Sequence, residues 1–195
     1  MFRQKHIAHA ALYGAAYFLA ILTCIHFLQP ELNPIAEPLS RYAVDGRFSP
    51  LLVAGFCAFG IAEILLSFLF EDTQWGATLL FCTGIAMIVV GSVPMDIGPH
   101  ITWKGNLHVV AATIQLSLFP IATLFIAPSQ QQVALRAYSV LTGGVTLTLF
   151  CLLVIANFQR PSVFGLIQKI DIFLITAWVI IVSAWFTLSD TALKD

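Results

Sequence analysis

The sequence predicts an all-α integral membrane protein, a bundle of six transmembrane helices with both termini on the same side. Of its 195 residues, 59% are hydrophobic and only 10% are charged, and its mean hydropathy is +0.91. Soluble domains carry about 25% charged residues, and a helix needs about 20 apolar residues to cross a bilayer. Six such helices with short loops would use nearly the whole chain, so we expect a single transmembrane domain over residues 1–195.

Apolar runs and prolines set the expected helices. The first run follows Arg3 and Lys5, but it exceeds the about 7–15 residues of a signal-peptide core and lacks a small-residue cleavage site, so we interpret it as a membrane helix. Pro94 and Pro128 end the third and fourth runs, because proline lacks the N–H that a helix interior requires. Lipid offers the backbone no hydrogen-bond partner, so these runs must be helical. The expected helices span about 7–28, 50–70, 76–93, 107–127, 137–158 and 163–188.

Charge and cysteine usage narrow the partners. The net charge of −1 and the absence of a polybasic run give no indication of nucleic-acid binding. The four cysteines all lie within apolar runs and form no CxxC motif, so we interpret them as packing residues. Lysine and arginine are nearly balanced between the two sides, so the positive-inside rule barely discriminates. If Arg41 and Arg160 belong to a site, discounting them favours cytoplasmic termini in a prokaryotic inner (cell) membrane.

Polar residues gather on the side opposite the termini. The first loop there carries Ser40, Arg41 and Tyr42 after three spaced prolines, so it has much polar side chain and little flexibility. Such a loop resembles a cap over the bundle. The alternative is an interfacial loop in which Arg41 extends to the headgroups and Tyr42 lies among them.

The second loop on this side carries Asp96, His100 and His108, residue types that serve as acid, base or metal ligands. A carboxylate with two imidazoles is an acceptable zinc shell. The spacing matches no recognised zinc motif, so we assign no metal site and leave zinc open as a cofactor. In the alternative interpretation, His108 hydrogen-bonds a loop carbonyl and Asp96 pairs with Arg41 or Arg160.

The third loop carries Gln159 and Arg160, and two further acids lie within the spans. Arg160 either complements the dipole at a helix end or presents its planar fork to a phosphate or carboxylate. Glu63 and Asp171 fall inside expected helices. An intramembrane carboxylate needs a partner, a wet cavity or a bound proton, so both are candidate functional acids, and Asp171 joins the catalytic candidates.

Three segments resemble a known family. They are 38–43 (PLSRYA), 91–96 (GSVPMD) with 105–108 (GNLH), and 157–160 (NFQR). Together they resemble the domain-of-unknown-function 998 family of bacterial and archaeal multipass membrane proteins. Members typically show a serine in the first loop, a G-x-x-P-x-D turn, a G-x-x-H start to the fourth helix and Q/E-R after the fifth. The resemblance covers nearly the whole chain. It implies six helices and importance for these loops, but no reaction.

A fainter similarity is to the seven-helix membrane hydrolases related to alkaline ceramidases. These enzymes hold zinc near one membrane face with a serine, an aspartate and several histidines. In this sequence, the same residue types are Ser40, Asp96, His100 and His108. The chain lacks the seventh helix and the HxxxH placed on it, so the similarity does not extend to a complete zinc site.

The leading functional hypothesis is a polar pocket that opens towards lipid on this face and binds an amphiphile. Membrane lipids and an amphiphilic small molecule are then the expected partners. Arg41 and Arg160 would hold its headgroup, and Asp96 with His108 would form an acid–base pair if chemistry occurs. The remaining walls would come from Ser40, Tyr42, His100 and Gln159.

Two other functional classes also fit the sequence. In a non-catalytic scaffold or subunit, the loop charges would form a latch between Asp96 and an arginine. In an isoprenoid cyclase or isomerase, Asp96, Asp171 or Glu63 would donate the proton, and aromatic side chains would stabilise cationic intermediates.

Overall fold

The computed structural model is all-helical over the residues it describes, 2–44, 47–70, 72–98, 100–159 and 161–188, and it confirms the predicted fold class. Six of its helices are long and apolar enough to cross a membrane. These are α1 (Phe2–Leu28), α3 (Ser49–Ser67), α4 (Gln74–Ser92), α5 (Trp103–Ile126), α6 (Val133–Gln159) and α7 (Phe164–Leu188). The short helix α2 (Leu39–Tyr42) and the 3₁₀ turns η1 (Ala127–Ser129) and η2 (Pro161–Val163) lie in the connections.

Local signals explain where the helices start. Pro50 lies in the first turn of α3, where its missing N–H costs nothing. Thr102 caps α5 by accepting a hydrogen bond from the Gly105 backbone N–H at 3.1 Å. Three helices begin a full turn or more earlier than apolar content predicts, α1 at Phe2, α5 at Trp103 and α6 at Val133. The extra first turns of α1 and α5 are mostly polar, so hydropathy alone misses them, whereas the extra turn of α6 is mostly apolar.

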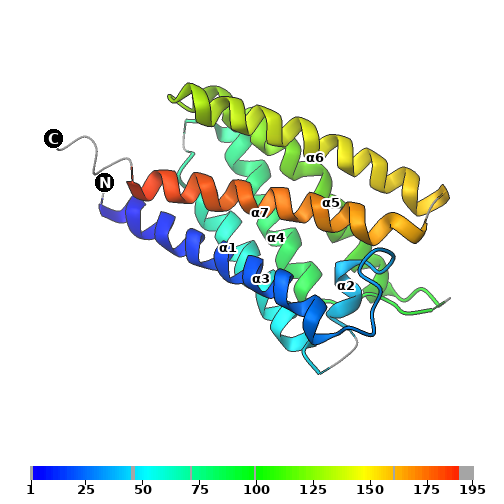
Figure 1. The fold of residues 1–195 in the computed structure, drawn as a ribbon. Coiled ribbons are helices and arrows are strands. Elements are labelled where there is room, and N and C mark those ends of the chain that lie inside the picture. Colours follow the sequence, from blue (N-terminus) through cyan, green and yellow to red (C-terminus); the bar gives the residue numbers. More distant parts are fainter. Residues whose placement is uncertain (1, 45–46, 71, 99, 160, 189–195) are drawn as a thin grey trace.

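The helices form a closed bundle in which most sequence neighbours pack together. Helix α3 packs between α1 and α4, α5 packs on α4, α6 packs between α5 and α7, and α7 returns to α1. Helix α1 begins and α7 ends at the same end of the bundle, and α2 lies near the opposite end (Figure 1). The three connections that carry the predicted site residues therefore converge at the α2 end.

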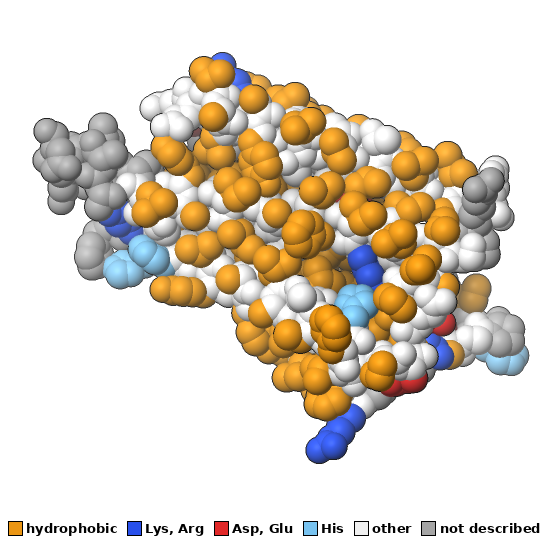
Figure 2. All heavy atoms as spheres, in the orientation of Figure 1, with side chains coloured by type: hydrophobic (Ala, Val, Ile, Leu, Met, Phe, Trp, Pro, Cys, Tyr) orange, Lys and Arg blue, Asp and Glu red, His pale blue; other side chains and the backbone are white. Residues whose placement is uncertain are grey.

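The bundle buries aromatic side chains and presents an apolar flank. Trp178 is fully buried, and its ring lies edge-on to that of Phe119 at 5.5 Å between centroids. The rings of Phe18 and Phe59 stack at 4.9 Å. Hydrophobic side chains cover the length of the flank in Figure 2. An apolar outer surface of this extent is what a bilayer requires, because lipid replaces water as the solvent.

Helices α3 and α4 cross most closely at a pair of glycines. A Cβ atom added to Gly60 would lie 2.5 Å from the backbone oxygen of Gly84, and one added to Gly84 would lie 2.5 Å from that of Gly60. Small residues allow helices to approach closely enough for packing to hold them together without a hydrophobic driving force. The crossing therefore tolerates no side chain at either position.

We predict that Gly60→Ala and Gly84→Ala each lower the thermal midpoint in detergent, because the added methyl must separate α3 from α4. Gly144→Ala is the matched control, since a Cβ there meets nothing within 4 Å and alanine favours a helix interior by about 0.5–1 kcal/mol over glycine. Its midpoint should stay level or rise. Equal midpoints for all three variants would contradict the close crossing.

Candidate functional site

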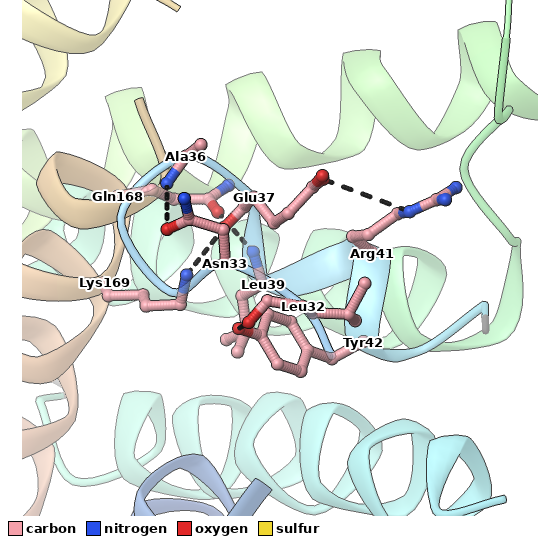
Figure 3. Close-up of polar contacts among 9 residues, drawn as sticks. All are labelled: Leu32, Asn33, Ala36, Glu37, Leu39, Arg41, Tyr42, Gln168 and Lys169. Atoms are coloured by element: carbon pink, nitrogen blue, oxygen red, sulfur yellow. Dashed lines mark hydrogen bonds and ion pairs between the residues drawn. The ribbon is translucent and has the colours of Figure 1, made fainter. Parts of the chain in front are cut away.

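The segment between α1 and α3 is held against α7 by the side chain of Lys169. Its Nζ donates hydrogen bonds to the backbone oxygens of Pro34 at 2.8 Å and Glu37 at 2.6 Å. The same ammonium lies 5.2 Å from the centre of the Tyr42 ring, within cation–π range. Figure 3 shows Lys169 reaching beneath this segment from α7. The Lys169 ammonium thus supplies hydrogen-bond donors to two backbone carbonyls that lie outside any helix.

Helix α7 makes three further contacts with this segment. The Leu39 N–H, at the start of α2, donates to Gln168 Oε1 at 2.8 Å. The Leu166 N–H donates to the Ile35 oxygen at 2.8 Å. A Cβ atom at Gly165 would collide with the Glu37 oxygen, so the glycine is what allows the backbones to meet. The first turns of α7 therefore fix the position of α2 along the bundle axis and its rotation.

Tyr42 and Arg41 project from α2 in different directions (Figure 3). Tyr42 is fully buried, and its hydroxyl donates to the Leu32 oxygen at 3.2 Å. Burial, together with the negative charges of Glu37 and Glu31, raises the pKa of Tyr42 above its usual value, so it stays a neutral phenol. The Arg41 Nε lies 4.0 Å from Glu37 Oε2 and points away from Gln168 and Lys169 (Figure 3).

We call residues 33–42, which α7 holds in place, the cap. A cavity of about 500 Å³ lies beside the cap, between α5, α6 and α7. Its walls are mostly apolar, from residues such as Leu116 on α5 and Leu153 on α6. The polar residues that line it are Ser40, His108, Thr113, Asn157 and Gln168. Ser40, His108 and Gln168 are each less than 7% exposed. The cavity is therefore an apolar chamber with a polar end formed where α2, α5 and α7 meet.

His108 has a defined tautomer in this cavity. Its Nδ1 lies 2.7 Å from the Val93 backbone oxygen. A carbonyl oxygen only accepts, so Nδ1 carries the proton and Nε2 of the neutral ring keeps its lone pair. The bond to the Val93 carbonyl thus orients the His108 ring so that Nε2 can accept a hydrogen bond or act as a base.

Asp96 organises the start of α5. Its carboxylate accepts hydrogen bonds from the Thr102 backbone N–H at 2.6 Å and the Thr102 hydroxyl at 2.8 Å. The carboxylate also lies directly over Gly105, where any Cβ would collide with it. A negative charge at a helix N-terminus is favoured by the helix dipole. The G-x-x-P-x-D turn and the glycine of G-x-x-H therefore form the start of α5 together. The turn supplies the carboxylate, and the glycine leaves room for it.

A family model described as "Protein of unknown function (DUF998)" matches residues 12–185. The chain belongs to the DUF998 family. The match runs from within α1 to within α7 and so includes the cap, the cavity and the α5 start. No curated protein and no solved structure matches the chain. Family membership thus agrees with the resemblance in the three motif segments and adds no reaction.

This DUF998 protein brings together only part of the predicted set. Ser40 and His108 line the cavity, whereas His100 and Gln159 are exposed and do not line it. Arg160 lies outside the described residues. Asp171 is fully buried, and neither of its carboxylate oxygens has a hydrogen-bond partner among the described residues. Asp96 pairs with Thr102 rather than with Arg41.

The residues that sequence reasoning missed are Gln168 and Lys169. Both fall in the first turns of an apolar helix, where polar side chains need a reason to be present. That reason is the proline-rich segment, because prolines and irregular backbone leave carbonyl oxygens unsatisfied. A polar pair at a helix start opposite such a segment is the signal that points to the contact.

Among the described residues, no group of three or more His, Cys, Asp or Glu side chains lies close enough to hold a metal ion.

We predict that Asp96→Asn destabilises the protein by about 1–2 kcal/mol, because an amide cannot accept both bonds as a carboxylate does. Thermal unfolding in detergent measures this. The control is Asp72→Asn, at an exposed loop position, which should change little. A level or raised midpoint for Asp96→Asn would instead indicate a residue retained for chemistry at the expense of stability.

We predict that Lys169→Met frees the cap, because methionine keeps the apolar stem and loses both donations to backbone oxygens. Hydrogen exchange of the amides in 33–42, measured by mass spectrometry, should accelerate on the order of 10-fold or more. Lys104→Met, at an exposed position, serves as the control. Unchanged exchange in the Lys169 variant would show that other contacts hold the cap.

Proposed function

We propose that this protein binds an amphiphile with an uncharged, hydrogen-bonding head in the cavity between α5 and α6. One observation carries the proposal: an apolar chamber of about 500 Å³ ends in Ser40, His108 and Gln168. Ligand sites of about 300–1,000 Å³ with a few convergent polar groups are typical of small-molecule binding. The apolar chain of such a ligand would lie along the apolar walls, and its polar head would lie at the polar end of the cavity.

The exposed walls of the cavity support entry from the bilayer. Val109 is 60% exposed, Val154 46% and Phe158 80%, and all three line the cavity. These side chains lie on spans whose outer surface faces lipid. A ligand with an acyl or isoprenoid chain therefore enters sideways between α5 and α6 and never exposes its chain to water.

Hydrogen bonding at the polar end selects the head. The Ser40 hydroxyl both donates and accepts, and the His108 Nε2 accepts. Gln168 has its Oε1 occupied by the Leu39 N–H, so its amide nitrogen is the group left to donate. Mixed donors and acceptors without a net charge suit a hydroxyl or amide head.

The described lining residues favour an uncharged head over the anionic one that Arg41 would hold, while Arg160 lies outside the described residues. Among the described residues that line the cavity, none is Asp, Glu, Lys or Arg. Arg41 projects from the other side of α2, beside Glu37. An anion held only by neutral groups in a low-dielectric chamber would be destabilised strongly, so the uncharged head is the better fit.

His108 determines which chemistry the site supports. Its Nε2 lone pair can accept a proton from a hydroxyl in the chamber, with Nδ1 fixed by the Val93 carbonyl. Ser40 supplies a hydroxyl on the same chamber wall. Proton transfer to and from a hydroxyl-bearing head is therefore the reaction step that these residues favour. In the orientation that we propose, the termini lie in the cytoplasm of a prokaryotic cell membrane and this polar end lies at the outer face.

A non-catalytic scaffold is the second candidate, and the cap favours it. The contacts from Lys169, Gln168 and Gly165 hold the segment between α1 and α3 rigidly, as a binding platform for another membrane protein would require. In that case the cavity is a packing defect and holds no defined ligand.

Native mass spectrometry of protein extracted with its surrounding lipid separates the two functions. Ala112 lines the cavity, so Ala112→Phe should fill it and abolish a defined adduct that the natural sequence retains. Ala137→Phe, at an exposed position on α6 outside the lining, should retain it. The same adduct on all three proteins, or no defined adduct on any, would reject the ligand cavity and favour the scaffold.

A further inference from the structure

A second polar centre lies deeper in the bundle, between α3 and α5. Glu63 is fully buried, and its Oε1 accepts a hydrogen bond from Gln115 Nε2 at 2.9 Å. The other atoms of this pair, Glu63 Oε2 and Gln115 Oε1, are buried and have no hydrogen-bond partner among the described residues. Gln115 is 3% exposed. An acid and an amide thus share one hydrogen bond and leave one acceptor each unsatisfied, while the neighbouring Thr83 hydroxyl on α4 donates to the Leu80 backbone oxygen.

A proton on Glu63 would give both unsatisfied oxygens a hydrogen-bond partner. An ionised carboxylate and an amide oxygen are acceptors only, so two such atoms in one pair cannot satisfy each other. A proton on Glu63 Oε2 turns it into a donor, for which Gln115 Oε1 is an unoccupied acceptor. The proton also neutralises a charge that apolar surroundings disfavour strongly. No cation among the described residues is recorded within ion-pair distance of Glu63.

A small cavity borders both Gln115 and the polar end of the ligand cavity. It has a volume of about 20 Å³, and a water molecule needs roughly 10–15 Å³ on the same measure. Gln115 lines it together with Ser40 and Gln168, the residues at the polar end of the larger cavity. Polar lining and adequate room make it suitable for one water molecule. Gln115 therefore separates the buried acid from a site for water that borders the ligand cavity.

We propose that Glu63 is a proton-binding site: a neutral carboxylic acid bonded in both directions to Gln115, which passes its proton to water from the small cavity when the Gln115 side chain moves aside. The pair stands on its own contacts, whereas its place at the inner end of a ligand site rests on the proposed function. With an amphiphile bound, the acid is a proton reservoir behind the polar end.

A monovalent metal cation is the competing occupant of the same two oxygens. Hard cations take about six or more oxygen ligands, and this pair offers two unsatisfied ones. A single proton uses both and leaves neither in excess. The hydrogen-bond inventory therefore favours the proton, and the cation becomes an outcome of the test.

Infrared difference spectroscopy in lipid nanodiscs tests the proposal without any ligand. The spectrum of the natural protein minus that of Glu63→Gln should show the carbonyl stretch of a protonated acid at neutral pH, and Asp171 cancels because both proteins contain it. Glu63→Gln should fold, since its amide N–H replaces the acid O–H as donor to Gln115. A carboxylate stretch that shifts with sodium, in place of the acid band, would overturn the proposal in favour of a cation.

Two further variants test the pairing and the route. In Gln115→Leu the acid band should move to higher frequency, because the carbonyl loses its hydrogen bond; an unmoved band would reject the pair. In D₂O the band should shift as the proton exchanges, and Ala112→Phe should slow this shift relative to Ala137→Phe. Equal exchange in both variants would reject the route through the cavity. The acid band in the natural protein does not depend on lipid retention, so loss of the ligand proposal leaves this one standing.

Discussion

The contact of Lys169 and Gln168 with the segment between α1 and α3 determines the shape of the candidate site. Hydrocarbon offers no hydrogen-bond partners, so irregular backbone near a membrane must be satisfied by protein. Lys169 satisfies the Pro34 and Glu37 oxygens, and Gln168 satisfies the Leu39 N–H. These bonds turn Ser40 towards α5 and place it on the wall that His108 also lines. The cavity exists in this form because α7 holds its cap.

The helices and the family could be predicted from the sequence because both depend on local signals. A span of about 20 apolar residues admits only a helix in lipid, and prolines mark where several spans end. The positions of Ser40 and His108 on one wall also followed in outline, since topology brings their loops to one end of the bundle. The starts of α1 and α5 were harder to predict, because their first turns are mostly polar.

The roles of Asp96, Arg41 and Lys169 could not be read from the sequence. An aspartate near a histidine looks the same whether it supports a helix start or moves a proton, and only the bonds to Thr102 show that Asp96 holds the N-cap residue of α5. Helix α2 has four residues, so its rotation depends on tertiary contacts rather than on any periodicity. That rotation puts Ser40 on the cavity and Arg41 away from it. Nothing near Lys169 in the sequence indicates its partners, which are backbone oxygens more than a hundred residues earlier.

Two polar centres with different chemistry therefore share the bundle. The outer one is neutral and borders a chamber that opens towards lipid, while the inner one is an acid–amide pair behind a small water-sized space. Buried polar groups in a membrane are expensive unless they are satisfied. We propose that a ligand bonds the remaining polar groups of the outer centre and that a proton satisfies those of the inner centre. This division explains why polar residues persist in a chain that is otherwise so apolar.

The most direct test is a structure determined by electron cryo-microscopy of the protein in nanodiscs formed from its own membrane, with a bound antibody fragment to give alignment. We expect elongated density between α5 and α6, with its inner end within hydrogen-bond distance of Ser40, His108 and Gln168. A chamber collapsed around the Phe150 and Phe158 side chains, or one without density in a map that resolves lipids elsewhere on the bundle, would contradict an amphiphile site.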